Sequence, residues 1–422
     1  MQPKIYHVDD HQIDTALIDP DALYILEKLK NAGFTAYLVG GSVRDLLIKK
    51  APKDFDISTS ARPEQIKSLF QRRCILIGRR FRLAHLRFGH KIFEVSTFRT
   101  GENVGELIVH DNEWGSEAQD VLRRDFTING MFYDAANHQV IDYVEGWEDI
   151  HKGVLRTIGN PEMRFKEDPV RIIRLIKFHA RFPFTIDAET EQAIHHCRLE
   201  ILKSSPARIL EEFLRMLESG ASTRFFQLLA QYGFLSLLFP ELANFIKSPH
   251  GKVIFHYLAS ADQIYHHKSK NTLDRPILTC GLIYPLLEKE IEKQYLSKKQ
   301  IPHIGEITIL ATTLIRDFLV KSFSHFPRRI TSAMVTILVT QYRLTPLSGR
   351  KHYREKMFRH KEFDMALKFL KIRALVNEKL VDTYTSIRNQ YRHFVKHDEH
   401  RHNPPPEKHH TTSEESLHAP TP

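Results

Sequence analysis

Cysteine is scarce in this chain, and the cysteines that occur are far apart. Cys74, Cys197 and Cys280 are the only three in 422 residues, and no two of them form a C-x-x-C pair. This spacing implies neither a disulfide framework nor a zinc cluster. It favours buried free thiols in a reducing compartment.

Long apolar runs are also missing. No run reaches the roughly 18 apolar residues that a membrane helix needs, and the N-terminal residues carry acidic side chains in place of the apolar core of a secretion signal. We therefore expect no membrane-spanning segment and a cytoplasmic location. The length of 422 residues allows two to four structural units.

Positive charge is in excess, which favours a polyanionic partner. The formal net charge is +10, and seven Lys or Arg but no acidic residue lie between Gln71 and Phe93. Residues 350–401 hold fourteen Lys or Arg against seven Asp or Glu. Both stretches include aromatic residues, a combination that suits nucleic-acid binding. A solvated basic surface is the alternative for each.

Two aspartates separated by one residue form the most informative motif. In the stretch Lys53-Asp54-Phe55-Asp56-Ile57 a β-strand would direct both carboxylates to one face and both apolar side chains to the other. Two carboxylates held so close repel each other, unless a divalent cation such as Mg²⁺ lies between them. A solvated strand is the alternative. Glu94, in an alternating stretch over residues 91–99, would add a third carboxylate if its strand lies beside this one.

A glycine turn precedes the aspartates. Residues 34–39 predict a strand, and Gly40-Gly41-Ser42-Val43-Arg44 then opens a helix. Backbone N–H groups at such a turn can bind phosphate, and we expect the Ser42 hydroxyl and the Arg44 charge to contribute. A Gly-Gly turn alone is weak evidence.

Two later clusters could hold a nucleotide. A short helical stretch over residues 122–131 would bring Arg124, Asp125 and Asn129 to one side, with an Arg124–Asp125 structural pair as the alternative. Asp168 and Arg171 are three residues apart near a predicted helix start, where they could read the edge of a base. A surface salt bridge would look the same in the sequence.

The order of these motifs resembles the class II nucleotidyltransferases, which comprise the bacterial poly(A) polymerases and the CCA-adding tRNA nucleotidyltransferases. The resemblance rests on Gly40-Gly41-Ser42-Val43-Arg44-Asp45, Asp54-Phe55-Asp56, the stretch from Arg123 to Asn129, and Glu167-Asp168-Pro169-Val170-Arg171. The stretch from Leu76 to Leu86 is similar to a segment that marks the poly(A) polymerases. No HD phosphohydrolase motif of the longer CCA-adding enzymes is apparent.

The resemblance implies an α+β fold, with a mixed, polymerase-beta-like nucleotidyltransferase head followed by an all-helical neck, body and leg. Its expected parts are a flexible N-terminus (1–18), a catalytic head (19–158), a neck that binds base and RNA (159–205), a helical body (206–345), a basic RNA-binding helical region (346–402) and a disordered tail (403–422). Within the body, the spacing of Arg208 and Glu212 favours a pair inside one helix.

The implied activity is addition of AMP from ATP to RNA 3′ ends without a template, with release of pyrophosphate. Asp54 and Asp56 would bind two Mg²⁺ ions, and Glu94 matches the third acidic position. The nucleotide-binding residues would be Gly40, Gly41, Ser42, Arg44, Arg124, Asp125, Asn129, Asp168, Arg171 and Arg174, and Arg79, Arg80 and Arg82 would bind RNA.

The expected partners are RNA 3′ ends and ATP, with RNA-degradation or RNA-chaperone proteins as further candidates, and the chain is expected to be a monomer. CCA addition to tRNA is the alternative within the family, since it uses the same motifs. A non-catalytic RNA-binding protein is the alternative of another class.

Overall fold

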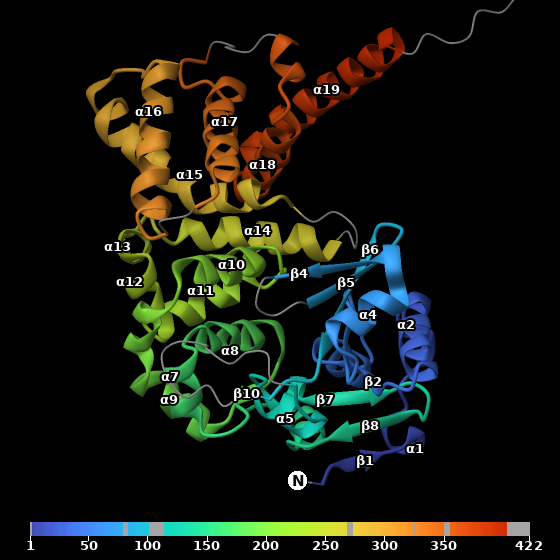
Figure 1. The fold of residues 1–422 in the computed structure, drawn as a ribbon. Helices are drawn as coiled ribbons and strands as arrows, with labels where there is room; N and C mark the ends of the chain where they lie inside the picture. The colour runs from blue at the N-terminus through green and yellow to red at the C-terminus, as the bar shows by residue number, and fades with distance from the viewer. Residues whose placement is uncertain are drawn as a thin grey trace, which may run out of the picture. The chain divides into compact units, whose positions relative to one another are not determined.

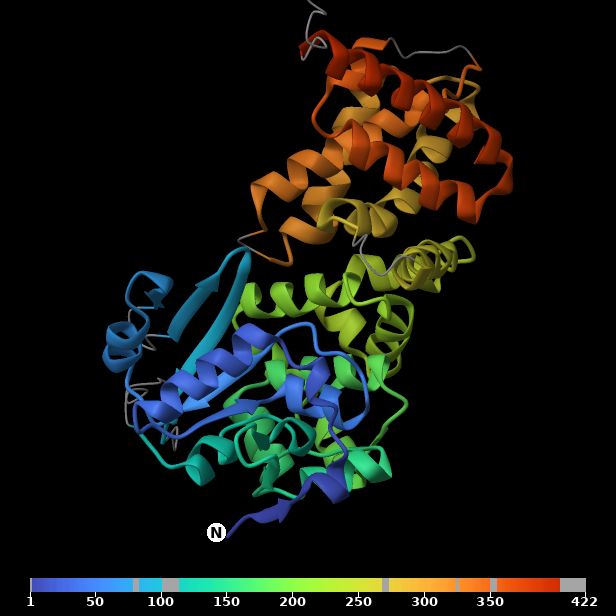
Figure 2. The same ribbon diagram turned by 90° about the vertical axis from the view of Figure 1, so that its right-hand side faces the viewer.

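The chain forms two compact units. The computed structural model describes residues 2–78, 83–100, 114–267, 273–323, 326–349 and 355–402. The first unit comprises residues 1–249 and 318–326, and the second comprises residues 250–317 and 327–422. Figures 1 and 2 show the sheet in the N-terminal part of the chain and helices in the remainder. The first unit therefore contains all of the predicted head and neck and the start of the predicted body.

A mixed sheet of eight strands in the order β1-β8-β7-β2-β3-β6-β5-β4 organises the first unit. Its strands are β1 (Lys4–Tyr6), β2 (Ala36–Val39), β3 (Asp56–Thr59), β4 (Cys74–Ile77), β5 (Leu83–Phe88), β6 (Lys91–Thr97), β7 (Met131–Asp134) and β8 (Gln139–Asp142). Only β3 and β6 are parallel among the neighbouring pairs. This one parallel pair holds the aspartate motif.

The helix before β2 follows from its sequence. Asp19 accepts a hydrogen bond from the Asp21 N–H, and Pro20 occupies the first turn of α2 (Pro20–Asn31). Ile25 and Leu29 form its fully buried stripe, and Gly33 takes a positive φ of 86° just after the helix. Local sequence signals therefore determine both ends of this helix.

Helices complete the first unit. They are α1 (Val8–His11), η1 (Thr15–Leu17), α3 (Gly41–Leu47), α4 (Pro63–Phe70), η2 (Gln71–Arg73), α5 (Glu117–Leu122), η3 (Thr127–Asn129), α6 (Gly146–Lys152), α7 (Pro161–Glu167), α8 (Val170–Arg181), α9 (Ala188–His196), η4 (Arg198–Lys203), α10 (Pro206–Leu217), α11 (Ser222–Gln231), α12 (Phe234–Leu238) and α13 (Pro240–Lys247). A separate parallel pair joins β9 (Val154–Leu155) to β10 (Thr185–Ile186). This pair lies outside the main sheet.

The N-terminal segment is more ordered than its polar sequence suggested. Lys4 to Tyr6 pair with β8 as an antiparallel edge strand. The Tyr6 ring stacks on Trp147, with centroids 4.1 Å apart. The prediction that residues 1–18 form a loose segment is wrong here, because backbone pairing and this ring contact compensate for the weak apolar pattern.

The second unit is helical throughout its described residues. Its elements are α14 (Val253–His267), α15 (Arg275–Gln294), η5 (Leu296–Lys298), α16 (Ile304–Ile315), α17 (Arg328–Leu344), η7 (Glu355–Arg359), α18 (Phe363–Val376), η8 (Glu378–Leu380) and α19 (Val381–His402), and the π-helical turn η6 (Arg316–Val320) crosses from this unit into the first. Phe363, Leu367 and Leu370 of α18 pack with Leu344 of α17. The basic region expected at residues 346–402 therefore shares a core with the helix before it. Across the described residues, none of the helices is both long and apolar enough to span a bilayer.

Candidate active site

Three acidic side chains gather at the parallel strand pair. The register places Asp56 of β3 opposite Glu94 of β6. Phe55 and Ile57 are buried, whereas Asp54, Asp56 and Glu94 are exposed. This is the alternation that the sequence predicted, although the strand begins only at Asp56 and Asp54 lies just before it.

Asp54, Asp56 and Glu94 together form a carboxylate row, and the electrostatics of this row would favour a bound cation. The pKa of Asp56 is raised to about 6, because neighbouring protein atoms desolvate the carboxylate and because Glu94 and Asp54 repel its charge, while Arg124 opposes the rise. A divalent ion would relieve this repulsion.

The donor set fits a hard ion such as Mg²⁺. Two aspartates supply only oxygen, and Mg²⁺ commonly takes one or two carboxylates and completes its shell with water and substrate phosphates. Among the described residues, no group of three or more His, Cys, Asp or Glu side chains is arranged to hold a metal ion.

The glycine turn lies beside these carboxylates. Gly40 precedes α3 with φ 70° and ψ −129°, a conformation that favours glycine. A Cβ at Gly40 would lie 3.6 Å from Nη1 of Arg124 and 4.0 Å from Oδ2 of Asp56. The turn, the arginine and the aspartate predicted from separate motifs therefore meet at one place.

Ser42 and Arg44 turn away from the role expected of them. The Ser42 hydroxyl donates to the Val39 carbonyl (2.9 Å). The Arg44 side chain is buried, donates to Asp45 and to Asn129, and stacks over the Phe182 ring at 4.8 Å. Both side chains are thus engaged within the protein, and in this arrangement they support the turn instead of presenting polar groups to a ligand.

Residues 122–131 do not form the single helical stretch that we expected. The helix α5 ends at Leu122, and Phe126 then forms a bridge with Thr157. Backbone pairing with residues 156–158, together with complete burial of Phe126 and Ile128, outweighs the local helical spacing. The side chains of this loop consequently diverge.

Arg124 faces the carboxylate row. Its Nη2 donates to Asp120 (2.8 Å) and to the Ser58 hydroxyl (3.1 Å). Neither the predicted cluster nor the alternative Arg124–Asp125 pair occurs, because the carboxylate of Asp125 accepts hydrogen bonds from two other arginines, Arg171 and Arg174.

Asp125 ties this loop to α8. Its two oxygens accept from Nε of Arg171 (2.8 Å) and Nη1 of Arg174 (2.6 Å). Burial alone would raise the pKa of Asp125, but the charges of Arg174 and Arg171 lower it below its usual value. Arg174 also donates to Glu212 of α10 (2.7 Å), which Lys177 contacts as well. A chain of ion pairs therefore connects the loop with two helices.

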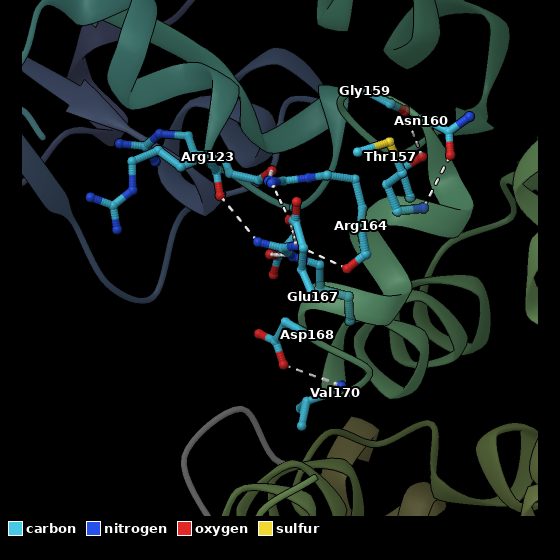
Figure 3. A network of polar contacts seen from close by, with 12 residues as sticks. Arg123, Thr157, Gly159, Asn160, Arg164, Glu167, Asp168 and Val170 are labelled. Carbon is cyan, nitrogen blue, oxygen red and sulfur yellow. Dashed lines mark hydrogen bonds and ion pairs between the residues drawn. The ribbon is translucent and has the colours of Figure 1, made fainter. Parts of the chain in front are cut away.

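Figure 3 shows how α7 and the start of α8 meet the same loop. Arg164 donates to the carbonyl of Arg124 (2.9 Å), and Arg171 donates to the carbonyl of Arg164 (2.9 Å). The carboxylate of Asp168 accepts from the Val170 N–H (3.3 Å) at the end of the network drawn in the figure.

The predicted base-reading pair is held apart by other partners. Asp168 accepts from Arg208 of α10 (2.6 Å), and Arg171 is buried against Asp125. The pair expected between Arg208 and Glu212 is therefore wrong, since each is bound to another element. Long-range ion pairs therefore form in place of the local pairs Asp168–Arg171 and Arg208–Glu212.

Four further residues contact the predicted site residues, and three of the predicted RNA contacts lie outside the described residues. Ser58, Ser96, Asp120 and Arg208 contact site residues, and only the two serines carried a signal, being two residues after Asp56 and Glu94. The predicted RNA contacts Arg79, Arg80 and Arg82 fall outside the described residues.

Comparison with known proteins adds a family to this geometry. The chain matches a poly A polymerase head domain over residues 36–156, a probable RNA and SrmB-binding site of polymerase A over residues 183–246, and the polymerase A arginine-rich C-terminus over residues 312–416. It is 36% identical to Poly(A) polymerase I of Salmonella typhi over 87% of this chain and 81% of that protein. The chain belongs to the poly(A) polymerase family. It is therefore a nucleotidyltransferase, as the resemblance of its motifs implied.

This chain is also similar to CCA-adding enzymes. The enzyme of Lactobacillus helveticus is 38% identical, over 49% of this chain and 52% of that one. A crystal structure of the Bacillus stearothermophilus CCA-adding enzyme in complex with CTP superposes with a TM-score of 0.61 at 26% identity, covering 87% of this chain and 83% of that one. An apo CCA-adding enzyme gives a TM-score of 0.60 at 17% identity. These matches confirm the predicted fold class, a mixed head followed by helices.

Proposed function

We propose that this enzyme transfers AMP from ATP to the 3′ end of RNA without a template and releases pyrophosphate. The observation that carries this proposal is the convergence of Asp56, Glu94, Gly40 and Arg124 at the parallel strand pair. A carboxylate pair beside a phosphate-binding turn is what nucleotidyl transfer requires.

Asp54 and Asp56 would hold Mg²⁺, as two ions, with Glu94 as the neighbouring acidic residue. Bound there, the metal supplies Lewis-acid activation of the RNA 3′-hydroxyl and neutralises charge on the phosphates. In the transfer, the 3′-oxygen forms a bond to the α-phosphorus while the bond from that phosphorus to pyrophosphate breaks. The aspartates orient these groups, and the neighbouring Glu94 keeps their site strongly negative.

The triphosphate would lie along the backbone of Gly40 and Gly41, next to Arg124. The first N–H groups of a helix have no partner within the helix, so those at the start of α3 suit phosphate oxygens. Ser42, Arg44 and Asn129 would shape this turn, since they bond to the protein itself. Asp125, Arg171 and Arg174 would form the wall against ribose and base, with their positions fixed by the ion pairs between them.

Two observations favour ATP over CTP as the substrate. Sequence identity to Poly(A) polymerase I of Salmonella typhi extends over 87% of this chain, whereas sequence identity to the CCA-adding enzyme of Lactobacillus helveticus extends over 49% of it. In addition, Asp168 is occupied by Arg208, which would leave fewer free polar groups to read a cytosine edge. CCA addition to tRNA is the second candidate, because the solved CTP complex shares the fold.

Substrate choice separates the two candidates. The enzyme is supplied with Mg²⁺ and radiolabelled ATP or CTP, and with either an unstructured RNA or a tRNA that lacks its CCA end. We expect ATP to extend the unstructured RNA with many AMP residues. Efficient CTP incorporation on the tRNA would contradict the proposal and favour CCA addition.

RNA would be held by basic surfaces outside the carboxylate row. Arg79, Arg80 and Arg82 are proposed contacts, together with exposed Arg392 and Lys396 of α19. Such contacts add a sequence-independent, salt-sensitive contribution to affinity. A purely RNA-binding protein would depend on these residues alone and would tolerate loss of Asp54.

A further inference from the structure

Next to the carboxylate row lies a second row, made of hydroxyl groups. Ser58 follows Asp56 by two residues on β3, and Ser96 follows Glu94 by two residues on β6, so each hydroxyl lies on the same face as the carboxylate before it. The parallel register pairs Ser58 with Ser96, as it pairs Asp56 with Glu94. The two Oγ atoms are 3.1 Å apart.

A continuous run of hydrogen bonds connects this row of hydroxyl groups with Arg124. Arg124 can only donate, so the Ser58 oxygen accepts from its Nη2 at 3.1 Å. Ser96 donates its proton to the Ile57 carbonyl (3.3 Å). In this arrangement Ser58 donates to Ser96, and the chain runs from Arg124 through Ser58 and Ser96 to the backbone of β3.

This chain fixes one side of the Arg124 guanidinium. Asp120 accepts from the same Nη2 (2.8 Å), while Nη1 points to Gly40 at the phosphate turn. Ser58 is fully buried, so solvent does not compete for its hydroxyl. The anchored nitrogen faces the sheet, and the other nitrogen faces the place proposed for the triphosphate.

We propose that Ser58, supported by Ser96, is a positioning residue that aims Arg124 at the nucleotide phosphates. The inference rests on the proposed function, in which Arg124 contacts the triphosphate. Ser58 does not touch the nucleotide, and its effect passes entirely through Arg124. Replacing Ser58 should therefore weaken ATP binding when Arg124 is present and have no effect when Arg124 is absent.

A double-mutant cycle tests this coupling. The variants are Ser58→Ala, Arg124→Ala and the combination, measured by kcat/KM for ATP, KM for RNA, and equilibrium binding of a fluorescent ATP analogue. Ser58→Ala removes one of the two hydrogen bonds at Nη2 that orient Arg124, so kcat/KM and affinity for ATP should fall about 3- to 10-fold. KM for RNA should not change. In the Arg124→Ala background, Ser58→Ala should have no further effect.

A matched control and a second variant keep the result interpretable. Ser60→Ala removes a hydroxyl at the end of the same strand, where it bonds the Thr35 N–H and not Arg124, and it should leave ATP affinity unchanged. Ser96→Ala, one link farther along the chain, should show a smaller loss with the same dependence on Arg124. It replaces Ser58→Ala if that variant does not fold.

Equal losses with and without Arg124 would overturn the proposal, as would an unchanged ATP affinity in Ser58→Ala. If Arg124→Ala itself binds ATP normally, the phosphate contact and this proposal both fail. A wild-type enzyme that uses CTP would refute the proposed substrate but not this inference, because the cycle can be repeated with CTP, whose triphosphate is the same.

Discussion

Removing the Asp125 carboxylate should destabilise the first unit strongly. In Asp125→Ala, Arg171 loses a partner at 2.8 Å and Arg174 loses one at 2.6 Å, and only 9% of the Arg171 side chain is exposed. Removing one member of a buried ion pair costs about 3–5 kcal/mol. Arg174 is 30% exposed and keeps Glu212 as a partner, so we expect the low end, about 3 kcal/mol.

Fluorescence can follow the unit concerned, because the only two tryptophans, Trp114 and Trp147, both lie in it. A loss of about 3 kcal/mol predicts a fall in Tm of roughly 6–12 °C for a unit of this size. Asp125→Asn keeps the shape of the side chain and should cost less. The control is Glu148→Ala, which breaks an exposed pair with Lys152 and should cost under about 1 kcal/mol.

The pH dependence of this loss has a defined sign. The folded-state pKa of Asp125 is lowered, so its stabilisation is complete above the unfolded-state value of about 3.9 and disappears as pH falls through the folded-state value. Wild type and Asp125→Asn should therefore converge in stability in acid. If Asp125→Ala costs no more than Glu148→Ala at pH 7, the ion-pair account of this region is wrong.

Three further predictions concern the metal, the base and the RNA. The pKa of Asp56 is raised to about 6, so protons should compete with Mg²⁺ for its carboxylate and weaken apparent Mg²⁺ affinity about 10-fold for each pH unit below 6. Initial rates measured against Mg²⁺ concentration at several pH values test this. They would show no such trend if Asp56 is not a ligand. Arg208→Ala frees Asp168 and should raise CTP incorporation relative to ATP, whereas Lys203→Ala, which breaks a pair with Glu200 in η4, should not; equal nucleotide ratios in both variants would contradict the role given to Arg208. Replacing exposed Arg392 and Lys396 with Gln should reduce the salt slope of RNA binding by about 1.4, and an unchanged slope in a filter-binding titration would remove α19 as an RNA contact.

The elements that carry local signals could be predicted from the sequence. Asp19, Pro20 and Gly33 specify the ends of α2, and alternation specifies the faces of Asp56 and Ile57. Glu94 could be suggested as a third carboxylate because it interrupts an apolar alternation. Its register with Asp56, which makes it a neighbour, depends on a strand order that no local pattern encodes.

The ion pairs that were predicted incorrectly share one physical cause. Spacing within a helix predicted pairs such as Arg208 with Glu212, but Arg208 pairs with Asp168 and Glu212 pairs with Arg174, both on other elements. A buried carboxylate gains more from two arginines on another helix than from a neighbour exposed to solvent. Arg44 likewise has tertiary partners that its charge alone does not predict, namely Asp45, Asn129 and the Phe182 ring.

The central claim is that the aspartate pair is the metal-binding centre of nucleotidyl transfer, and one measurement tests it most directly. Extension of an unstructured RNA by ATP and Mg²⁺ is compared in wild type, Asp56→Asn, and the control Asp21→Asn, which alters an acid that pairs with Lys91. RNA binding is measured for each protein. We predict that Asp56→Asn loses activity by about 10³-fold and keeps its RNA affinity, while Asp21→Asn stays active. Normal extension by Asp56→Asn would contradict the account.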